Sequence, residues 1–174
     1  SSALAGSAPE ILIGQIAAAT STLRVGSGGV MLSHYSPYKV AETFRMLEAF
    51  YPGRIDLGIG RAPGSDQLTA AALANGPRRD TEENFPRAVV DLVRWMHDSI
   101  EPEHRFATVK AQPSLTTAPD VWLLGSSDYS AMLAAHLGLP FSFAHHFMPQ
   151  NTLGALDLYL ELDHSCQLFN SMFS

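Results

Sequence analysis

Three short segments of the sequence carry residue types that could hold a flat, phosphorylated ligand. Ser27-Gly28-Gly29 offers backbone without bulky side chains, against which a planar ring could lie. Arg61 follows a second apolar run, and an arginine at such a place can clamp a phosphate with a forked hydrogen bond. Residues 125–130 place several serines at the start of an expected helix, where free N–H groups and the helix dipole favour an anion.

Two of these segments also have a purely structural explanation. Gly28 and Gly29 could reflect tight packing between neighbouring strands, as glycines within strands often do. Arg61 could form a surface ion pair, for example with Asp66. Both explanations stay open on the residues alone.

The serines of the third segment could cap a helix instead of binding an anion. Ser126, Ser127 and Ser130 follow the apolar run 121–124, and serine is a favoured residue at the N-terminus of a helix. Capping accounts for one serine more easily than for three. If a phosphate does bind here, we expect Asp128 to face solvent, because like charges repel.

Histidines follow two of the expected strands and are the candidates for catalysis. His145 and His146 come directly after one apolar run, and His34 follows another. Adjacent residues on a strand point in opposite directions, so the pair predicts no metal site by itself. The sequence contains no P-loop and no Gly-x-Ser-x-Gly turn, which argues against an NTPase or a hydrolase.

Apolar periodicity predicts helices and strands that alternate along the chain. Expected helices cover 8–19, 37–51, 82–99, 130–137 and 151–162, and expected strands cover 23–32, 54–60, 121–124 and 141–144. Residues 67–81 are expected to form a short helix and a loop. Alternation implies parallel strands joined by crossover helices. The pattern alone does not separate an open doubly wound sheet from an arc of a (β/α)₈ barrel.

Composition and charge exclude several other classes. A length of 174 residues and 46% hydrophobic content predict one globular domain with a core. The net charge of −6 argues against a nucleic-acid surface. Cys166 is the single cysteine, which excludes an internal disulfide and favours the cytoplasm. No apolar run is long enough for a membrane span, and the first residues do not resemble a secretory signal.

Two blocks of sequence resemble the bacterial luciferase-like, flavin-dependent monooxygenases. They are SGGVMLSHYSPYKVAETFRMLEAFYPGRIDLGIGRAPG at 27–64 and VWLLGSSDYSAMLAAHLGLPFSFAHHF at 121–147. With residues 7–15, the resemblance extends over most of the chain, to about Tyr159. It implies an α/β fold, a partial TIM-type (β/α)₈ barrel with about four parallel strands and flanking helices. Residues 1–162 would form this partial barrel domain, and residues 163–174 an atypical C-terminal tail.

The resemblance also implies a binding site for flavin mononucleotide (FMN). The family often has a non-proline cis peptide under the isoalloxazine ring, and Gly28-Gly29 matches that position at a strand end. Arg61 and the serines match the positions that hold the phosphate. The residues expected to bind the cofactor are Gly28, Gly29, Arg61, Ser126, Ser127 and Ser130. Ser33-His34 departs from the family, in which Pro-Asn is common at these positions.

The implied activity is oxidation of an organic small molecule by reduced flavin and O₂, with a separate reductase supplying the reduced flavin. His145 and His146 are the candidate catalytic residues. A truncated, non-catalytic flavin-binding or assembly protein is the alternative, and a deazaflavin could take the place of FMN. Half a barrel leaves two open sheet edges, so a homo-oligomer that covers them is also expected.

Overall fold

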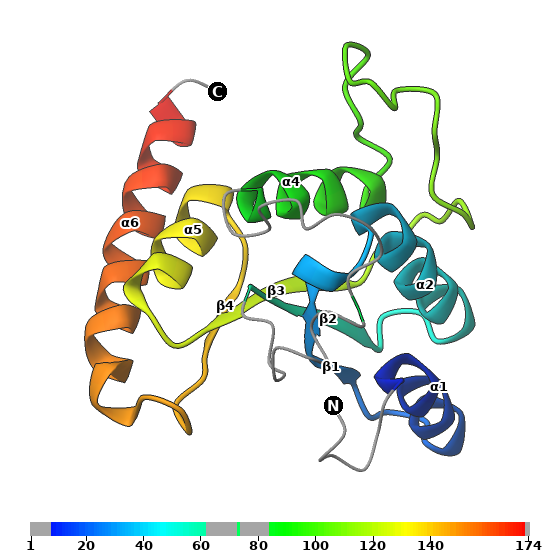
Figure 1. Ribbon diagram of the computed structural model, residues 1–174, viewed down its shortest axis with the longest axis horizontal. Helices are drawn as coiled ribbons and strands as arrows, with labels where there is room; N and C mark the ends of the chain where they lie inside the picture. The colour runs from blue at the N-terminus through cyan, green and yellow to red at the C-terminus, as the bar shows by residue number, and fades with distance from the viewer. Residues whose placement is uncertain (1–7, 62–72, 74–83, 173–174) are drawn as a thin grey trace.

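The computed structural model describes residues 8–61, 73 and 84–172, with only the backbone described for 164–172. Helices and strands alternate along this part of the chain, as the periodicity predicts (Figure 1). The elements are helix α1 (Pro9–Ala19), strand β1 (Val25–Met31), 3₁₀ helix η1 (Leu32–His34), α2 (Pro37–Phe50), β2 (Ile55–Gly60), α4 (Phe85–Met96), β3 (Asp120–Gly125), α5 (Asp128–Leu137), β4 (Phe141–Phe143), 3₁₀ helix η2 (Pro149–Asn151) and α6 (Thr152–Met172).

Local sequence signals explain where several helices begin and end. Pro9, Pro37 and Pro86 lie in the first turns of α1, α2 and α4, where the missing N–H of proline breaks no hydrogen bond. Helix α5 ends at Leu137, and its C-cap Gly138 has a φ of 63°, the left-handed conformation that glycine adopts without strain.

The four strands form one parallel sheet in the order β1-β2-β3-β4. Their pairing places Met31 beside Gly60, Gly60 beside Leu124, and Gly125 beside Phe143, so the carboxyl ends of all four strands meet at one edge. Figure 1 shows the helices arranged around the outside of these strands. A ligand that binds at this edge can therefore contact residues that follow four different strands.

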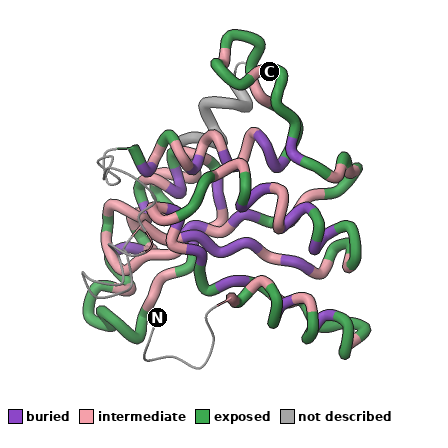
Figure 2. Tube along the Cα trace, turned by 45° about the vertical axis from the view of Figure 1, so that its right-hand side comes forward, coloured by how far each residue is buried: buried purple, intermediate pink, exposed green. Residues whose placement is uncertain are grey.

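One face of the sheet packs against the helices and forms the core. Buried positions concentrate in the strands and on the helix surfaces that face them (Figure 2). The strand residues in this core are Val30, Ile55, Leu57, Ile59, Val121, Leu123 and Phe141. They alternate with residues on the opposite face, as a strand with one face buried requires.

The opposite face carries small and polar residues in place of large aliphatic ones on β1 and β2. Gly26, Gly28, Asp56 and Gly58 occupy it in neighbouring register, and Trp122 of β3 lies beside Gly58. The Trp122 Nε1–H donates a hydrogen bond of 3.3 Å to the carboxylate of Asp56. On β1 and β2 this glycine-rich face therefore carries few large side chains.

An ionic network ties the amino ends of three strands together. Arg24 donates hydrogen bonds to Asp56 of β2, at 2.5 and 3.2 Å, and to Asp120 of β3 at 2.7 Å. The bond to Asp56 and then that to Asp120 raise the pKa of Arg24 above its ordinary value. The network lies at the edge opposite the strand ends, and its role is structural.

A second arginine is buried inside the helical layer. Arg45 of α2 is 1% exposed. Its guanidinium donates to the carbonyl oxygens of Trp95 at 2.9 Å, Met96 at 2.8 Å and Pro113 at 2.8 Å. It also forms an ion pair of 2.8 Å with Asp98. Arg45 therefore satisfies carbonyls at the C-terminal end of α4, which helices leave without intrahelical partners.

Some boundaries differ from those that the sequence predicts. Helix α6 runs to Met172, although we expected a helix that ends at Leu162. Residues 163–172 contain no proline or glycine, so nothing in them stops the helix. Leu32 belongs to η1 and not to the preceding strand. The expected helix and loop at 67–81 lie outside the described residues, apart from residue 73.

Membrane-spanning helices and metal-binding clusters are both absent from the described residues. None of the helices described is long and apolar enough to cross a membrane. Within the same residues, no group of three or more His, Cys, Asp or Glu side chains is placed to hold a metal ion.

Candidate functional site

The glycine pair of β1 lies within the strand and not at its end. The peptide bond between Gly28 and Gly29 is cis, as the resemblance implies. Gly28 pairs with Gly58, and the register then shifts so that Val30 pairs with Ile59. Our expectation of a position at the strand end is thus wrong, because the strand continues past this irregularity to Met31.

The two glycines meet different surroundings. A Cβ added to Gly28 would find no atom within 4 Å, whereas one added to Gly29 would lie 2.5 Å from the carbonyl oxygen of Gly58. The same Cβ would lie 2.7 Å from the side chain of Leu124. Gly29 is therefore required by close packing, whereas Gly28 faces open space on the glycine-rich face of the sheet. The packing explanation holds for Gly29, and it does not account for Gly28.

The serines at the start of α5 do not cap the helix through their side chains. Ser127 is the N-cap residue in an extended conformation, and its hydroxyl makes no capping hydrogen bond. That hydroxyl instead lies 3.4 Å from the hydroxyl of Ser130. Asp128 is exposed, as we expected for a carboxylate beside an anion site. The capping explanation thus fails for Ser127. The Ser130 N–H donates to the Ser127 carbonyl oxygen at 3.1 Å, which leaves the N–H groups of Asp128 and Tyr129 as the ones without an acceptor in the helix.

Gly125 is needed because Ser130 lies directly against it. A Cβ on Gly125 would be 2.1 Å from the Ser130 hydroxyl and 2.3 Å from its Cβ. Ser126, half-buried, joins β3 to α5 between these two residues. The strand end and the first turn of the helix therefore form one close-packed unit that presents serine hydroxyls and backbone N–H groups together.

Arg61 reaches this unit from the neighbouring strand. Its guanidinium carbon lies 4.5 Å from the centre of the Tyr129 ring, in the first turn of α5. No described residue accepts a hydrogen bond from Arg61 or forms an ion pair with it. The ion pair with Asp66 that we considered involves a residue outside those described. Arg61 and the first turn of α5, far apart in the sequence, thus lie side by side.

The histidines are placed at the same edge but in a different local setting. His145 and His146 lie in an exposed turn after β4, so they are not on the strand. The His145 Nδ1 is 2.8 Å from the Thr152 hydroxyl at the start of α6, and the His146 ring packs on Phe147 at 4.2 Å. Neither histidine hydrogen-bonds to Arg61 or to the described serines. His34 ends η1, beyond the carboxyl end of β1.

Tyr129 is the site residue that sequence reasoning missed. The contact between Arg61 and Tyr129 depends on how β2 and α5 are placed side by side, and no spacing in the sequence encodes it. The only signal for it in the sequence is an aromatic residue at the serine-rich start of a helix.

Within the described residues, Ser33 is also notable, because its buried hydroxyl has no hydrogen-bond partner.

Comparison with known proteins identifies the family of the chain. The family described as luciferase-like monooxygenase matches residues 3–162. A luciferase-like monooxygenase of Escherichia coli (strain K12) is 53% identical over 156 residues, which are 90% of this chain and 45% of that protein. The chain therefore spans about half the length of the curated relatives that it matches.

Solved structures share the fold. The crystal structure of apo-MsnO8 is 47% identical with a TM-score of 0.77, and the match covers 88% of this chain and 44% of that one. The oxygenating constituent of 3,6-diketocamphane monooxygenase from Pseudomonas putida, solved in complex with FMN, is 17% identical with a TM-score of 0.63. That match covers 91% of this chain and 48% of the other. The expected α/β class, with four parallel strands and flanking helices, is confirmed, and the chain belongs to the luciferase-like monooxygenase family.

Proposed function

We propose that this chain is the central part of an FMN-dependent monooxygenase, which uses reduced flavin and O₂ to oxidise an organic small molecule. One observation carries the proposal: Arg61 and the first turn of α5 converge at the end of a sheet whose open face bears Gly28. Helix N-termini and arginine forks are the groups that proteins use for phosphates. The residues present therefore fit a ligand with a phosphate and a flat ring.

In this proposal each group has a separate task. Arg61 and the N–H groups of α5, with the hydroxyls of Ser127 and Ser130, hold the phosphate. Gly28 leaves room for the ring against the sheet, because no side chain fills that space. Bound flavin supplies the electrons and the reaction with O₂, and the protein supplies position and exclusion of water. Ser126, Gly29, His145 and His146 remain proposed members of this site, the two histidines as candidates for proton transfer.

Substitution of Arg61 by alanine should weaken FMN binding and leave riboflavin binding unchanged. A charge-assisted hydrogen bond contributes about 1.5–3 kcal/mol, which corresponds to roughly a 10- to 150-fold rise in Kd for FMN. Riboflavin lacks the phosphate, so it reports the ring site alone. Quenching of flavin fluorescence on titration with the purified chain measures both constants.

Arg105→Ala is the matched control for this titration. Arg105 also lies on an aromatic ring, 4.3 Å from the centre of Phe106, but it follows α4 on a separate segment. Its loss should change neither Kd. Equal binding of FMN by wild type and Arg61→Ala would contradict the phosphate role, and flavin binding without O₂-dependent substrate oxidation would select the non-catalytic alternative.

We also propose that a second copy of the chain covers the sheet edges. Strands β1 and β4 are the outer strands of the described sheet, and an unpaired strand edge offers a row of backbone donors and acceptors. Light scattering should then give a mass of about twice the 18.8 kDa of one chain. A stable monomer at micromolar concentration would exclude this assembly. A flavin reductase is the further partner proposed.

A further inference from the structure

The contact between Arg61 and Tyr129 differs from that between Arg54 and Tyr51. Arg54, which lies 5.9 Å from the Tyr51 ring centre, also donates hydrogen bonds to the carbonyl of Leu23 and to the Thr20 hydroxyl. Those bonds give Arg54 a complete structural role. The Arg61 guanidinium makes no such bond to a described residue, so within this part of the chain the Tyr129 ring is what fixes its position.

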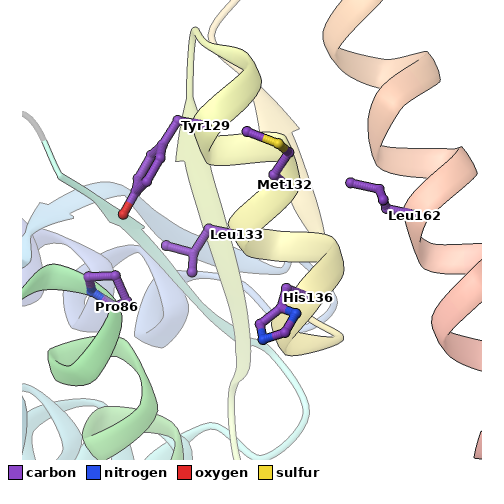
Figure 3. Close-up of a pocket in the computed structure, with 6 residues that line it drawn as sticks. All are labelled: Pro86, Tyr129, Met132, Leu133, His136 and Leu162. Atoms are coloured by element: carbon purple, nitrogen blue, oxygen red, sulfur yellow. The ribbon is translucent and has the colours of Figure 1, made fainter.

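The Tyr129 ring lies among apolar side chains at the start of α5. It lines an apolar cavity of about 390 Å³ between α4, α5 and α6. Figure 3 shows the side chain extending from the start of α5 toward α4, on the side of the cavity where Pro86 lies. The ring is therefore half-buried at the edge of this cavity. The residues that line this cavity are Pro86, Tyr129, Met132, Leu133, His136 and Leu162.

Stacking on a ring leaves an arginine able to bind an anion. The guanidinium presents its flat face to an aromatic ring, while its N–H donors point outward in the guanidinium plane. A free arginine side chain loses about 2 kcal/mol of rotamer entropy when it is fixed in one geometry. An arginine that is already stacked has lost part of that entropy before the ligand arrives, so more of the binding free energy remains.

We propose that Tyr129 is a positioning residue, which holds the Arg61 guanidinium over the first turn of α5 so that arginine and helix N-terminus grip the same phosphate. This inference rests on the proposed FMN site and adds to it how the arginine is prepared for binding. Tyr129 acts through Arg61 and does not contact the phosphate. Its effect should therefore appear only with ligands that carry a phosphate, and only while Arg61 is present.

The test compares three variants of the full 174-residue chain in FMN and riboflavin titrations. Tyr129→Leu keeps an apolar side chain in the cavity wall but removes the ring face, and should raise the Kd for FMN about 3- to 10-fold, the size of a partly exposed cation–π contact. Riboflavin binding should stay unchanged. Tyr129→Phe keeps the ring and should bind FMN as the wild type does. In the Arg61→Ala background, Tyr129→Leu should have no further effect.

The outcomes separate this inference from the function on which it rests. Arg61-dependent binding of FMN that Tyr129→Leu leaves intact would overturn the positioning role and keep the phosphate site. An equal loss of riboflavin and FMN binding in Tyr129→Leu, or an undiminished loss in the Arg61→Ala background, would show a general packing role and also overturn it. Wild-type chain that binds neither flavin would remove the proposed site and the positioning role together.

Discussion

Replacement of Arg45 by alanine should lower the free energy of unfolding by about 3–5 kcal/mol, because the backbone carbonyls that it satisfies would lose their donor. The guanidinium donates four hydrogen bonds that join α2 to the end of α4 and to the segment after it. Alanine would leave the carbonyls of Trp95 and Met96 buried without a donor, and each unsatisfied group is costly. Domain stabilities are typically about 5–15 kcal/mol, so this loss is a large fraction.

Urea unfolding followed by tryptophan fluorescence measures this loss. Arg94→Ala is the matched control, because Arg94 pairs with Glu101 on the more exposed side of α4, with 29% of its side chain accessible. Exposed ion pairs contribute about 0–1 kcal/mol, so this variant should unfold almost as the wild type does. Arg45→Lys gives a second reading when the alanine variant does not fold. A single lysine ammonium cannot reach the carbonyls of α4 and the Asp98 carboxylate together. Most of the stability that Arg45 contributes should therefore still be lost. Similar midpoints for Arg45→Lys and Arg94→Ala would contradict this account.

Arg45 also shows where sequence reasoning stops. The periodicity of Val40, Phe44 and Leu47 predicts the apolar face of α2, and all three are buried. A charged residue beside Phe44 is ordinarily assigned to solvent. Its burial depends on carbonyls supplied by a segment far along the chain, and these exist only after α4 has packed on α2. Local sequence patterns thus predict helices and their apolar faces. They do not predict hydrogen bonds between residues that meet only through tertiary packing.

Part of the candidate site also follows from the sequence, and part of it does not. Alternation of helix and strand predicts that all strand ends meet at one edge, and this places Arg61 near Ser127 without further information. The role of Tyr129 was missed, because it depends on the side-by-side placement of β2 and α5. The resemblance implies a strand end for Gly28-Gly29, whereas the strand accommodates the pair with a register shift and continues to Met31. The residues after 162 are unlike the family and suggest a change of structure, whereas helix α6 continues through them to Met172.

Substitution of Gly58 by alanine should destabilise the fold strongly, whereas the same change at Gly28 should not. The Cβ of a residue at 58 would lie 2.1 Å from the Ser27 carbonyl oxygen, a contact with backbone that no rotamer change relieves. Strand β1 would have to move away from β2, and we expect a loss of about 3 kcal/mol or more, at the upper end for overpacked sites. A Cβ at 28 meets nothing within 4 Å, so its stability should change by less than about 1 kcal/mol. Thermal and urea unfolding measure the stability of the two variants. Equal destabilisation would contradict the difference between the crowded position 58 and the open position 28.

Gly28→Ala should instead impair flavin binding, because the added methyl group enters the space proposed for the ring. Overpacking costs about 1–3 kcal/mol, which corresponds to roughly a 5- to 150-fold rise in Kd. The phosphate is not involved, so FMN and riboflavin should lose affinity by similar factors, in contrast to Arg61→Ala, which affects FMN alone. Together the two variants report on the two halves of the site. If Gly28→Ala bound both flavins as well as the wild type, the ring would not lie on this face of the sheet, and the open space beside Gly28 would need another explanation.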